Sequence, residues 1–121
     1  VEVLDNPVAG EWFGTLKGFT SFHWHGETFG IPVGATRILA SAACANQAFA
    51  LGPHLGMQCH VEMTEDMIAE WGRLGADEIA ANPCATVQQA DAMLAGVPQH
   101  LDALHAVAGR LYARWIAGLK R

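Results

Sequence analysis

The hydrophobic and polar positions follow two different patterns on either side of Glu62. Residues 1–62 hold eight of the 13 glycines and several short apolar runs separated by turn residues, which is typical of strands and loops. Residues 63–121 are rich in Ala, Leu, Glu and Gln and repeat their apolar positions with the period of a helix. We therefore expect one domain over residues 1–121, with strands and loops in 1–62 and a helical tail in 63–121.

Short apolar segments bounded by Gly, Pro, Asn and Asp predict the strands of the first part. Pro7–Gly14 predicts a short helical turn. Connections between the strands of residues 20–60 are too short for the crossovers that parallel pairs need, so the sheet should be antiparallel or mixed. The expected strands are Val1–Leu4, Thr20–His25, Thr36–Ser41, Gln47–Leu51 and Met57–His60.

Capping signals predict where the helices of the second part begin. Thr64 is a suitable N-cap, and the two acidic residues that follow it suit the positive end of the helix dipole. Thr86, with Gln89 three residues later, has the pattern of a capping box. The expected helices are Glu65–Leu74, Val87–Ala95 and Pro98–Leu119, and the last has an apolar stripe of Leu101, Leu104, Ala108, Leu111, Trp115 and Leu119.

Composition excludes several classes of protein. The chain is 51% hydrophobic and 16% charged, whereas disordered chains are poor in apolar residues and rich in charge. Its net charge is −5 and its longest basic run is Lys120-Arg121, so it lacks the basic footprint of a nucleic-acid-binding protein. We expect no transmembrane segment. Three cysteines without CxxC spacing argue against disulfides and favour a reducing, cytoplasmic compartment.

The segment Gln58-Cys59-His60-Val61-Glu62 carries the strongest candidate chemistry. Residues two apart on a strand share a face, so the Glu62 carboxylate can reach an imidazole nitrogen of His60. A general base needs such a pair, in which the acid fixes the tautomer and leaves the other nitrogen free to take a proton. The alternative is a structural histidine capped by a nearby carboxylate.

Two further features of the residues remain open. His23 and His25 have a spacing that metal ligands use, and with His60 they would form a metal site. Cys59 is adjacent to His60 and should point to the opposite face of the strand, so it cannot be a thiol that His60 serves. Cys44 and Cys84 are expected to be packing residues, and the chain contains no sequence typical of a nucleophile turn or a phosphate-binding loop.

Four motifs occur in an order that resembles a known family. They are Trp24-His25-Gly26-Glu27-Thr28-Phe29, Pro32-x-Gly34-Ala35-Thr36, Ala45-Asn46-Gln47-Ala48-Phe49 and Gly56-Met57-Gln58-Cys59-His60-Val61-Glu62. Together they resemble the C-terminal half of a class I glutamine amidotransferase, of the stand-alone type that is similar to the glutaminase domain of guanylate synthetase. The resemblance is strongest over residues 1–75 and looser in the helical tail.

The resemblance implies a fold, an activity and a set of site residues. The fold would be α/β, the C-terminal part of a flavodoxin-like amidotransferase, with a partial mixed sheet followed by about three helices. The activity would be hydrolysis of the glutamine side-chain amide by a Cys–His–Glu triad, without a cofactor, to deliver ammonia to a synthetase domain or subunit. His60 and Glu62 match the family's histidine and glutamate, and His25 and Glu27 lie in the region beside its glutamine pocket.

The resemblance also shows where this chain departs from the family. Most members have His-Pro-Glu, whereas this chain has Val61, and Cys59 replaces an aromatic residue. The family's nucleophilic cysteine lies in a G-x-C-x-G turn well before the histidine, and this chain, which begins at Val1, has no such turn. We therefore expect a fragment that is inactive alone and that forms a homo-oligomer or associates with the missing half. The rival hypothesis is a non-catalytic interaction domain of the same fold.

Overall fold

The first part of the chain forms a four-stranded antiparallel sheet. The computed structural model describes residues 1–119, and within them the strands lie in the order β1-β2-β3-β4. The predicted α/β class is confirmed, and the sheet, which was expected to be antiparallel or mixed, is antiparallel. The strands are β1 (Glu2–Val3), β2 (Thr36–Ala40), β3 (Ala48–Leu51) and β4 (His54–Met57).

The turn between β3 and β4 explains one wrong prediction. Leu51 lies opposite His54, so only Gly52 and Pro53 form the loop. Gly52 has a φ of 57°, a left-handed conformation that glycine adopts without a steric penalty. Because this turn is so tight, β4 begins at His54, and the predicted strand Met57–His60 contributes only its first residue.

The predicted strand Thr20–His25 is also wrong. Only Phe22 of this segment pairs with other backbone, through an isolated antiparallel bridge to His60. Its alternating aromatic residues have another role, because Phe22 and Trp24 pack on Trp71, a residue of the second half of the chain. An alternation of aromatic and polar residues therefore marks a loop that covers a helix.

Two of the helices begin at side chains that cap their first turns. The Asn6 side chain accepts a hydrogen bond from the Ala9 N–H at 2.8 Å, and the Thr64 hydroxyl accepts one from the Met67 N–H at 3.2 Å. The helix after Thr64 has the predicted bounds, whereas the short α3 was not predicted. The helices are α1 (Pro7–Phe13), α2 (Glu65–Leu74), α3 (Ala76–Ala81) and α4 (Ala90–Ala117).

The helix α4 replaces two predicted helices. It continues through Gly96 and Pro98, and it begins at Ala90 without a side-chain cap, so the capping box predicted at Thr86 does not form. A proline inside a helix removes one backbone hydrogen bond. Packing outweighs this loss, since Val97 is buried next to the proline and the first half of α4 lies against α2. The close approach of the two helices depends on Gly72, because a Cβ atom there would lie 3.0 Å from the Cβ of Ala90.

The core consists of two clusters that share one residue. The larger lies between the sheet, α1 and the second half of α4, and the smaller lies between α2 and the first half of α4. Leu101 packs against both clusters and so joins the two ends of the domain. The buried residues of the larger cluster are Val3, Ala9, Trp12, Phe13, Ile38, Leu39, Ala48, Ala50, Cys59, Val61, Leu104, Val107, Ala108 and Leu111, and those of the smaller are Met63, Ile68 and Val97.

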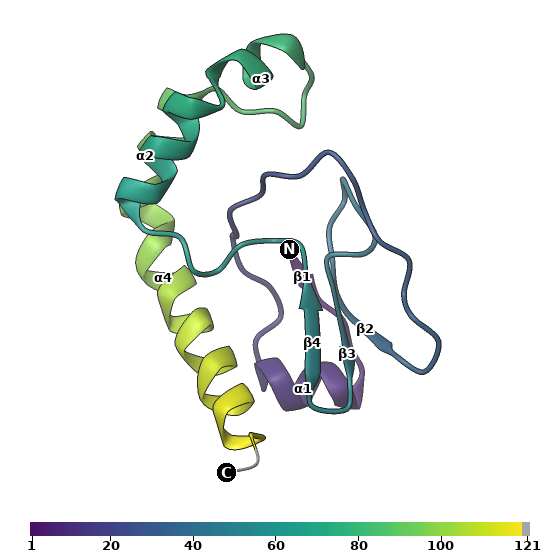
Figure 1. The fold of residues 1–121 in the computed structure, drawn as a ribbon. Coiled ribbons are helices and arrows are strands. Elements are labelled where there is room, and N and C mark those ends of the chain that lie inside the picture. The colour runs from purple at the N-terminus through teal and green to yellow at the C-terminus, as the bar shows by residue number, and fades with distance from the viewer. Residues whose placement is uncertain (120–121) are drawn as a thin grey trace.

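In Figure 1, α4 runs along one side of the molecule, with α2 beside its first half and the sheet beyond it. The second half of α4 contacts α1. Three residues of its predicted apolar stripe, Leu104, Ala108 and Leu111, are buried, whereas Trp115 and Leu119 are 47% and 50% exposed. No helix within residues 1–119 combines the length and the apolar character needed to cross a bilayer.

The cap of α2 gives a test of the fold. Replacing Thr64 by Ala should lower the free energy of unfolding by about 1 kcal/mol, because the Met67 N–H loses its partner. Thr86→Ala is the matched control and should change stability little, since Thr86 caps no helix. Urea denaturation followed by circular dichroism measures both. Equal losses for the two variants would show that Thr64 has no special role.

Candidate active site

The backbone at His60 is held by hydrogen bonds to Ser21 and Phe22 and by the burial of the two neighbouring side chains. Phe22 and His60 exchange two hydrogen bonds, from the His60 N–H at 2.8 Å and from the Phe22 N–H at 3.3 Å. The Ser21 hydroxyl also donates to the His60 carbonyl at 2.8 Å. The neighbours Cys59 and Val61 are 3% and 2% exposed and point into the core. The intervening side chain of His60 is thereby turned toward the surface.

The side chains of His60 and Glu62 meet as their spacing predicts. His60 Nδ1 lies 2.7 Å from Glu62 Oε1, and the two side chains are 26% and 42% exposed. The second carboxylate oxygen accepts a hydrogen bond from the Val61 N–H at 3.0 Å. Within the described part of the chain, His60 Nε2 has no hydrogen-bond partner, so it is free to exchange a proton with a reacting group. The catalytic role of the pair stays a prediction.

The pKa of Glu62 lies below the ordinary value of a glutamate. Partial burial raises this pKa, but the hydrogen bonds from His60, from the N–H of Glu62 itself and from the Val61 N–H outweigh the effect of burial. The carboxylate is therefore ionised at neutral pH and can only accept hydrogen bonds. It follows that neutral His60 carries its proton on Nδ1 and presents the lone pair of Nε2.

Aromatic rings surround the His60 imidazole. The centroid of the Trp71 ring lies 5.1 Å from that of His60, with an angle of 78° between the planes. The Phe22 ring lies 6.2 Å away at 65°. Both arrangements are edge-to-face, the geometry that aromatic pairs prefer.

The residues predicted to line the glutamine pocket lie in the loop between α1 and β2. His25 Nδ1 is 2.9 Å from the carbonyl oxygen of Glu27, so the loop turns back on itself there. The side chains of both residues are exposed. The structure brings His25 beside His23, with their ring centroids 5.9 Å apart. Among the described residues, no hydrogen bond, ion pair or ring contact joins His25 or Glu27 to His60. A role of His25 and Glu27 in substrate binding stays a prediction.

The pKa of His23 is lowered to about 4. Partial withdrawal from water is the main cause, and repulsion from the Val1 amino group, His25 and His60 adds to it. His23 is therefore neutral at pH 7. Within residues 1–119 no group of three His, Cys, Asp or Glu side chains is arranged to hold a metal ion, so the hypothesis of a site made by His23, His25 and His60 finds no support in the geometry.

A second polar cluster lies two residues before His60 in the chain. The side-chain amide of Gln58 donates to the Asn46 carbonyl at 2.7 Å and contacts Thr28 Oγ1 at 3.2 Å and Cys44 Sγ at 3.1 Å. The hydrogen bond with Thr28 is the main reason that the pKa of Cys44 lies below the ordinary value. Gln58 thus joins two other segments, the loop that contains Thr28 and the connection that contains Cys44 and Asn46.

The other two cysteines have simpler surroundings. Cys59 is buried beside His60, and its burial raises the pKa of its thiol. It belongs to the larger core cluster, as expected for a residue on the opposite side of the chain from His60. Cys84 is exposed in the segment between α3 and α4, and a hydrogen bond with Thr86 lowers its pKa.

Reasoning from the sequence missed the residues that come from distant segments. Gln58 could have been found, because it shares the alternation of His60 and Glu62. Trp71 could not, since its four-residue spacing from Met67 and Gly75 only marks one face of a helix. Its contact with His60 depends on where α2 packs.

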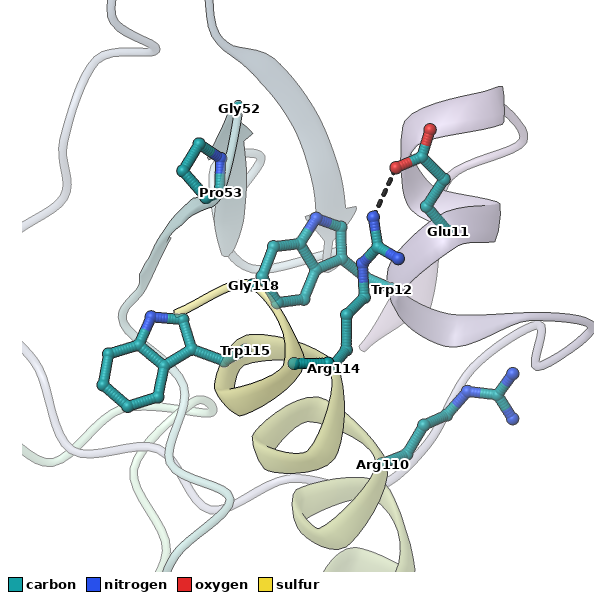
Figure 2. A pocket seen from close by; sticks show the side chains of 9 residues that line it. Glu11, Trp12, Gly52, Pro53, Arg110, Arg114, Trp115 and Gly118 are labelled. Atoms are coloured by element: carbon teal, nitrogen blue, oxygen red, sulfur yellow. Dashed lines mark hydrogen bonds and ion pairs between the residues drawn. The ribbon is translucent and has the colours of Figure 1, made fainter. Parts of the chain in front are cut away.

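A cleft of about 740 Å³ lies elsewhere, between α1, the β3–β4 turn and the end of α4 (Figure 2). Arg114 pairs with Glu11 across it and lies over the Trp12 ring, 5.1 Å from the ring centroid. None of the predicted site residues lines this cleft.

Comparison with solved structures confirms the resemblance found in the motifs. A glutamine amidotransferase from Methylobacillus flagellatus is 40% identical and superimposes with a TM-score of 0.93 over 99% of this chain. A glutamine amidotransferase from Thermotoga maritima, 24% identical, has the same fold, with a TM-score of 0.80 over 95% of the chain. The chain spans about half of their lengths, 51% and 47%. Neither a protein-family model nor a curated protein matches it.

The ionisation of Glu62 gives a test of the site geometry. The pKa of Glu62 should lie below that of an unstructured glutamate, and His60→Ala should raise it because the carboxylate loses its principal donor. A folded-state pKa below the unfolded value means that the pair stabilises the chain at neutral pH, and that this stabilisation is lost as the pH falls through the folded pKa. Carbon-detected NMR titration of the glutamate carboxyls measures the shift.

An independent ion pair provides the control for that titration. Arg73 and Glu70 are exposed residues of α2, and the guanidinium of Arg73 lowers the pKa of Glu70. Arg73→Ala should raise the pKa of Glu70 and leave that of Glu62 unchanged. A Glu62 pKa that does not respond to His60→Ala would contradict the hydrogen bond between the two residues.

Proposed function

We propose that this chain supplies the acid–base part of a glutaminase site, in which a Cys–His–Glu triad hydrolyses the side-chain amide of glutamine and releases ammonia. The observation that carries the proposal is the 2.7 Å contact between His60 and Glu62, in a chain whose fold matches half of a glutamine amidotransferase. A base held by a carboxylate, with its second nitrogen free, is what the activation of a thiol needs.

In the proposed reaction His60 moves two protons. Its Nε2 takes the thiol proton while the sulfur attacks the amide carbon, and it then gives that proton to the leaving nitrogen, so that ammonia departs and a glutamyl thioester remains. Water then attacks the thioester, with His60 as the base, and glutamate and the free thiol are restored. Glu62 stabilises the imidazolium that forms in each half of the reaction.

The nucleophile in this proposal is none of the three cysteines of the chain. Cys59 points into the core, away from the free nitrogen of His60. Cys84 is hydrogen-bonded to Thr86 in the segment between α3 and α4. Cys44 is engaged with Gln58 and Thr28. We therefore propose that the 121-residue chain alone does not hydrolyse glutamine.

We assign the recognition of glutamine to the loop that contains His25 and Glu27. Its tight turn leaves both side chains exposed, and the same loop reaches Gln58 through Thr28. The ammonia acceptor in this proposal is a synthetase domain or subunit. Three free thiols support a reducing, cytoplasmic compartment.

The alternative is an interaction domain that keeps the fold without catalysis. It predicts that His60 can be replaced without loss in any assembly that contains the chain. The hydrogen bond of Nδ1 to a carboxylate, with Nε2 left without a partner among the described residues, is the arrangement that a general base needs, and it favours the catalytic proposal.

A chimera tests the catalytic proposal. The 121-residue chain should replace the matching half of the Methylobacillus amidotransferase, because the two superimpose closely. In this chimera His60→Ala should lower kcat for glutamine hydrolysis by roughly 10²–10⁴-fold, the usual contribution of a general base. Glu62→Gln should lower it less, because the amide still accepts the Nδ1 hydrogen bond but has no charge. Ammonia release measures both.

Glu65→Gln is the matched control for these variants. Glu65 lies in the first turn of α2, exposed and outside the site, so its loss should leave the rate unchanged. An active chimera in which His60→Ala retains the parent rate would overturn the catalytic proposal and favour the interaction domain.

We also propose that the chain forms a homo-oligomer through the end of α4. Tyr112, Trp115, Ile116 and Leu119 make an apolar stripe that is between 47% and 54% exposed. Residues 103–119 contain two basic residues and no acidic one, whereas the chain as a whole has a net charge of −5. A second copy of the chain therefore carries a net charge opposite to that of this helix end.

Sedimentation velocity tests the proposed oligomer. The double replacement Trp115→Ser and Ile116→Ser should raise the dissociation constant by about tenfold or more, because aromatic anchors dominate such interfaces. Val33→Ser is the control, since Val33 is an exposed apolar residue of a loop far along the chain from α4. A monomer at micromolar concentration for the parent chain would refute the oligomer.

A further inference from the structure

Four aromatic rings from three segments come together, and one of them is the imidazole of the candidate base. Phe22 and Trp24 come from the loop before β2, His60 follows β4, and Trp71 belongs to α2. Trp71 contacts each of the other three, with centroid distances of 5.1 Å to His60, 5.8 Å to Phe22 and 6.1 Å to Trp24. We propose that Trp71 is a positioning residue that fixes the plane of the His60 imidazole, an inference that rests on the proposed function.

The hydrogen bond to Glu62 leaves one motion of the imidazole open. It fixes where Nδ1 lies, but the ring can still tilt about that contact and swing Nε2 through several directions. The Trp71 ring stands at 78° to the imidazole and Phe22 stands at 65°, so the two rings oppose the tilt from their edge-to-face contacts. A general base depends on the direction of its free nitrogen, because proton transfer requires an aligned donor at hydrogen-bond distance.

Trp71 is itself held from its far side. Trp24 packs against it at an angle of 84°, and the Trp24 indole N–H donates to Glu78 Oε2 of α3 at 3.0 Å. Gly75, between α2 and α3, allows the indole to lie against the chain, since a Cβ atom there would lie only 2.1 Å from the Trp24 ring. We name Trp24, Gly75 and Glu78 the indole latch.

The indole latch connects the base to the loop assigned to glutamine. Trp24 directly precedes His25, so the ring that supports Trp71 also anchors the start of the His25–Glu27 turn. A change in that loop would be transmitted to the imidazole through two ring contacts. The same group of residues therefore sets the geometry of the base and the position of the substrate loop.

The positioning role can be tested on the 121-residue chain without activity. In a chain with ¹³C-labelled histidine rings, NMR relaxation of the Cε1–H bond of His60 should give the high order parameter of a fixed imidazole. Trp71→Leu should lower this order parameter, because the ring is then free to tilt about its Nδ1 hydrogen bond. Trp71→Phe, which keeps an aromatic ring, should retain most of the order.

Two further variants guard against misfolding and non-specific effects. Glu78→Ala removes the acceptor of the Trp24 indole N–H and should lower the His60 order parameter in the same direction but by less. Trp115→Leu removes an exposed tryptophan of α4 and should leave the His60 order parameter unchanged. An unchanged His60 order parameter in a folded Trp71→Leu chain would overturn the proposal. If that variant unfolds, an unchanged order parameter in Glu78→Ala would do so.

The chimera separates this inference from the proposed function. There Trp71→Leu should lower kcat by about tenfold and leave KM within a factor of about two, because the base is displaced but the pocket remains. A tenfold rise in KM with an unchanged kcat would contradict a role in orienting the base. A chimera without activity would refute the proposed function, while the order parameter of the His60 ring would still decide the role of Trp71.

Discussion

The backbone bridge between Phe22 and His60 is the contact on which the rest of the candidate site depends. Its two hydrogen bonds join segments that are 38 residues apart in sequence, and the Ser21 hydroxyl reinforces them. The bridge places the loop that bears His25 next to the segment that bears Glu62. It also brings the Phe22 ring to His60. Without it, the hydrogen-bonded pair and the aromatic rings would belong to separate loops with no fixed relation.

The energetics of the site explain why so much structure surrounds one hydrogen-bonded pair, His60 and Glu62. His60 and Glu62 are partly exposed, and exposed pairs contribute little to stability because water screens them. Their geometry therefore cannot come from their attraction alone. It comes from Cys59 and Val61, which are buried on the opposite side of the chain, and from the Trp71 ring above the imidazole. Burial of apolar neighbours thus holds a polar pair at the surface.

The long helix α4 joins the two core clusters, and the apolar side chains near its end are partly exposed. Its first half packs on α2, its middle carries Leu101 between the two core clusters, and its second half contacts α1. Near the end of the helix its apolar side chains are about half exposed, with Trp115 at 47% and Leu119 at 50%. This exposed surface is the one through which we propose that the chain forms a homo-oligomer.

The sequence by itself determined what short-range chemistry controls. Thr64 fixed the start of α2, and the spacing of His60 and Glu62 indicated their contact, because a capping hydroxyl and an i, i+2 pair act over a few residues. The tertiary structure alone decided the rest. It kept α4 continuous through Pro98, since the burial of its neighbours outweighs a lost hydrogen bond. It also turned the aromatic residues around Phe22 from a predicted strand into the cover of a helix, because the partner of a ring is chosen by packing between distant segments, which no local pattern records.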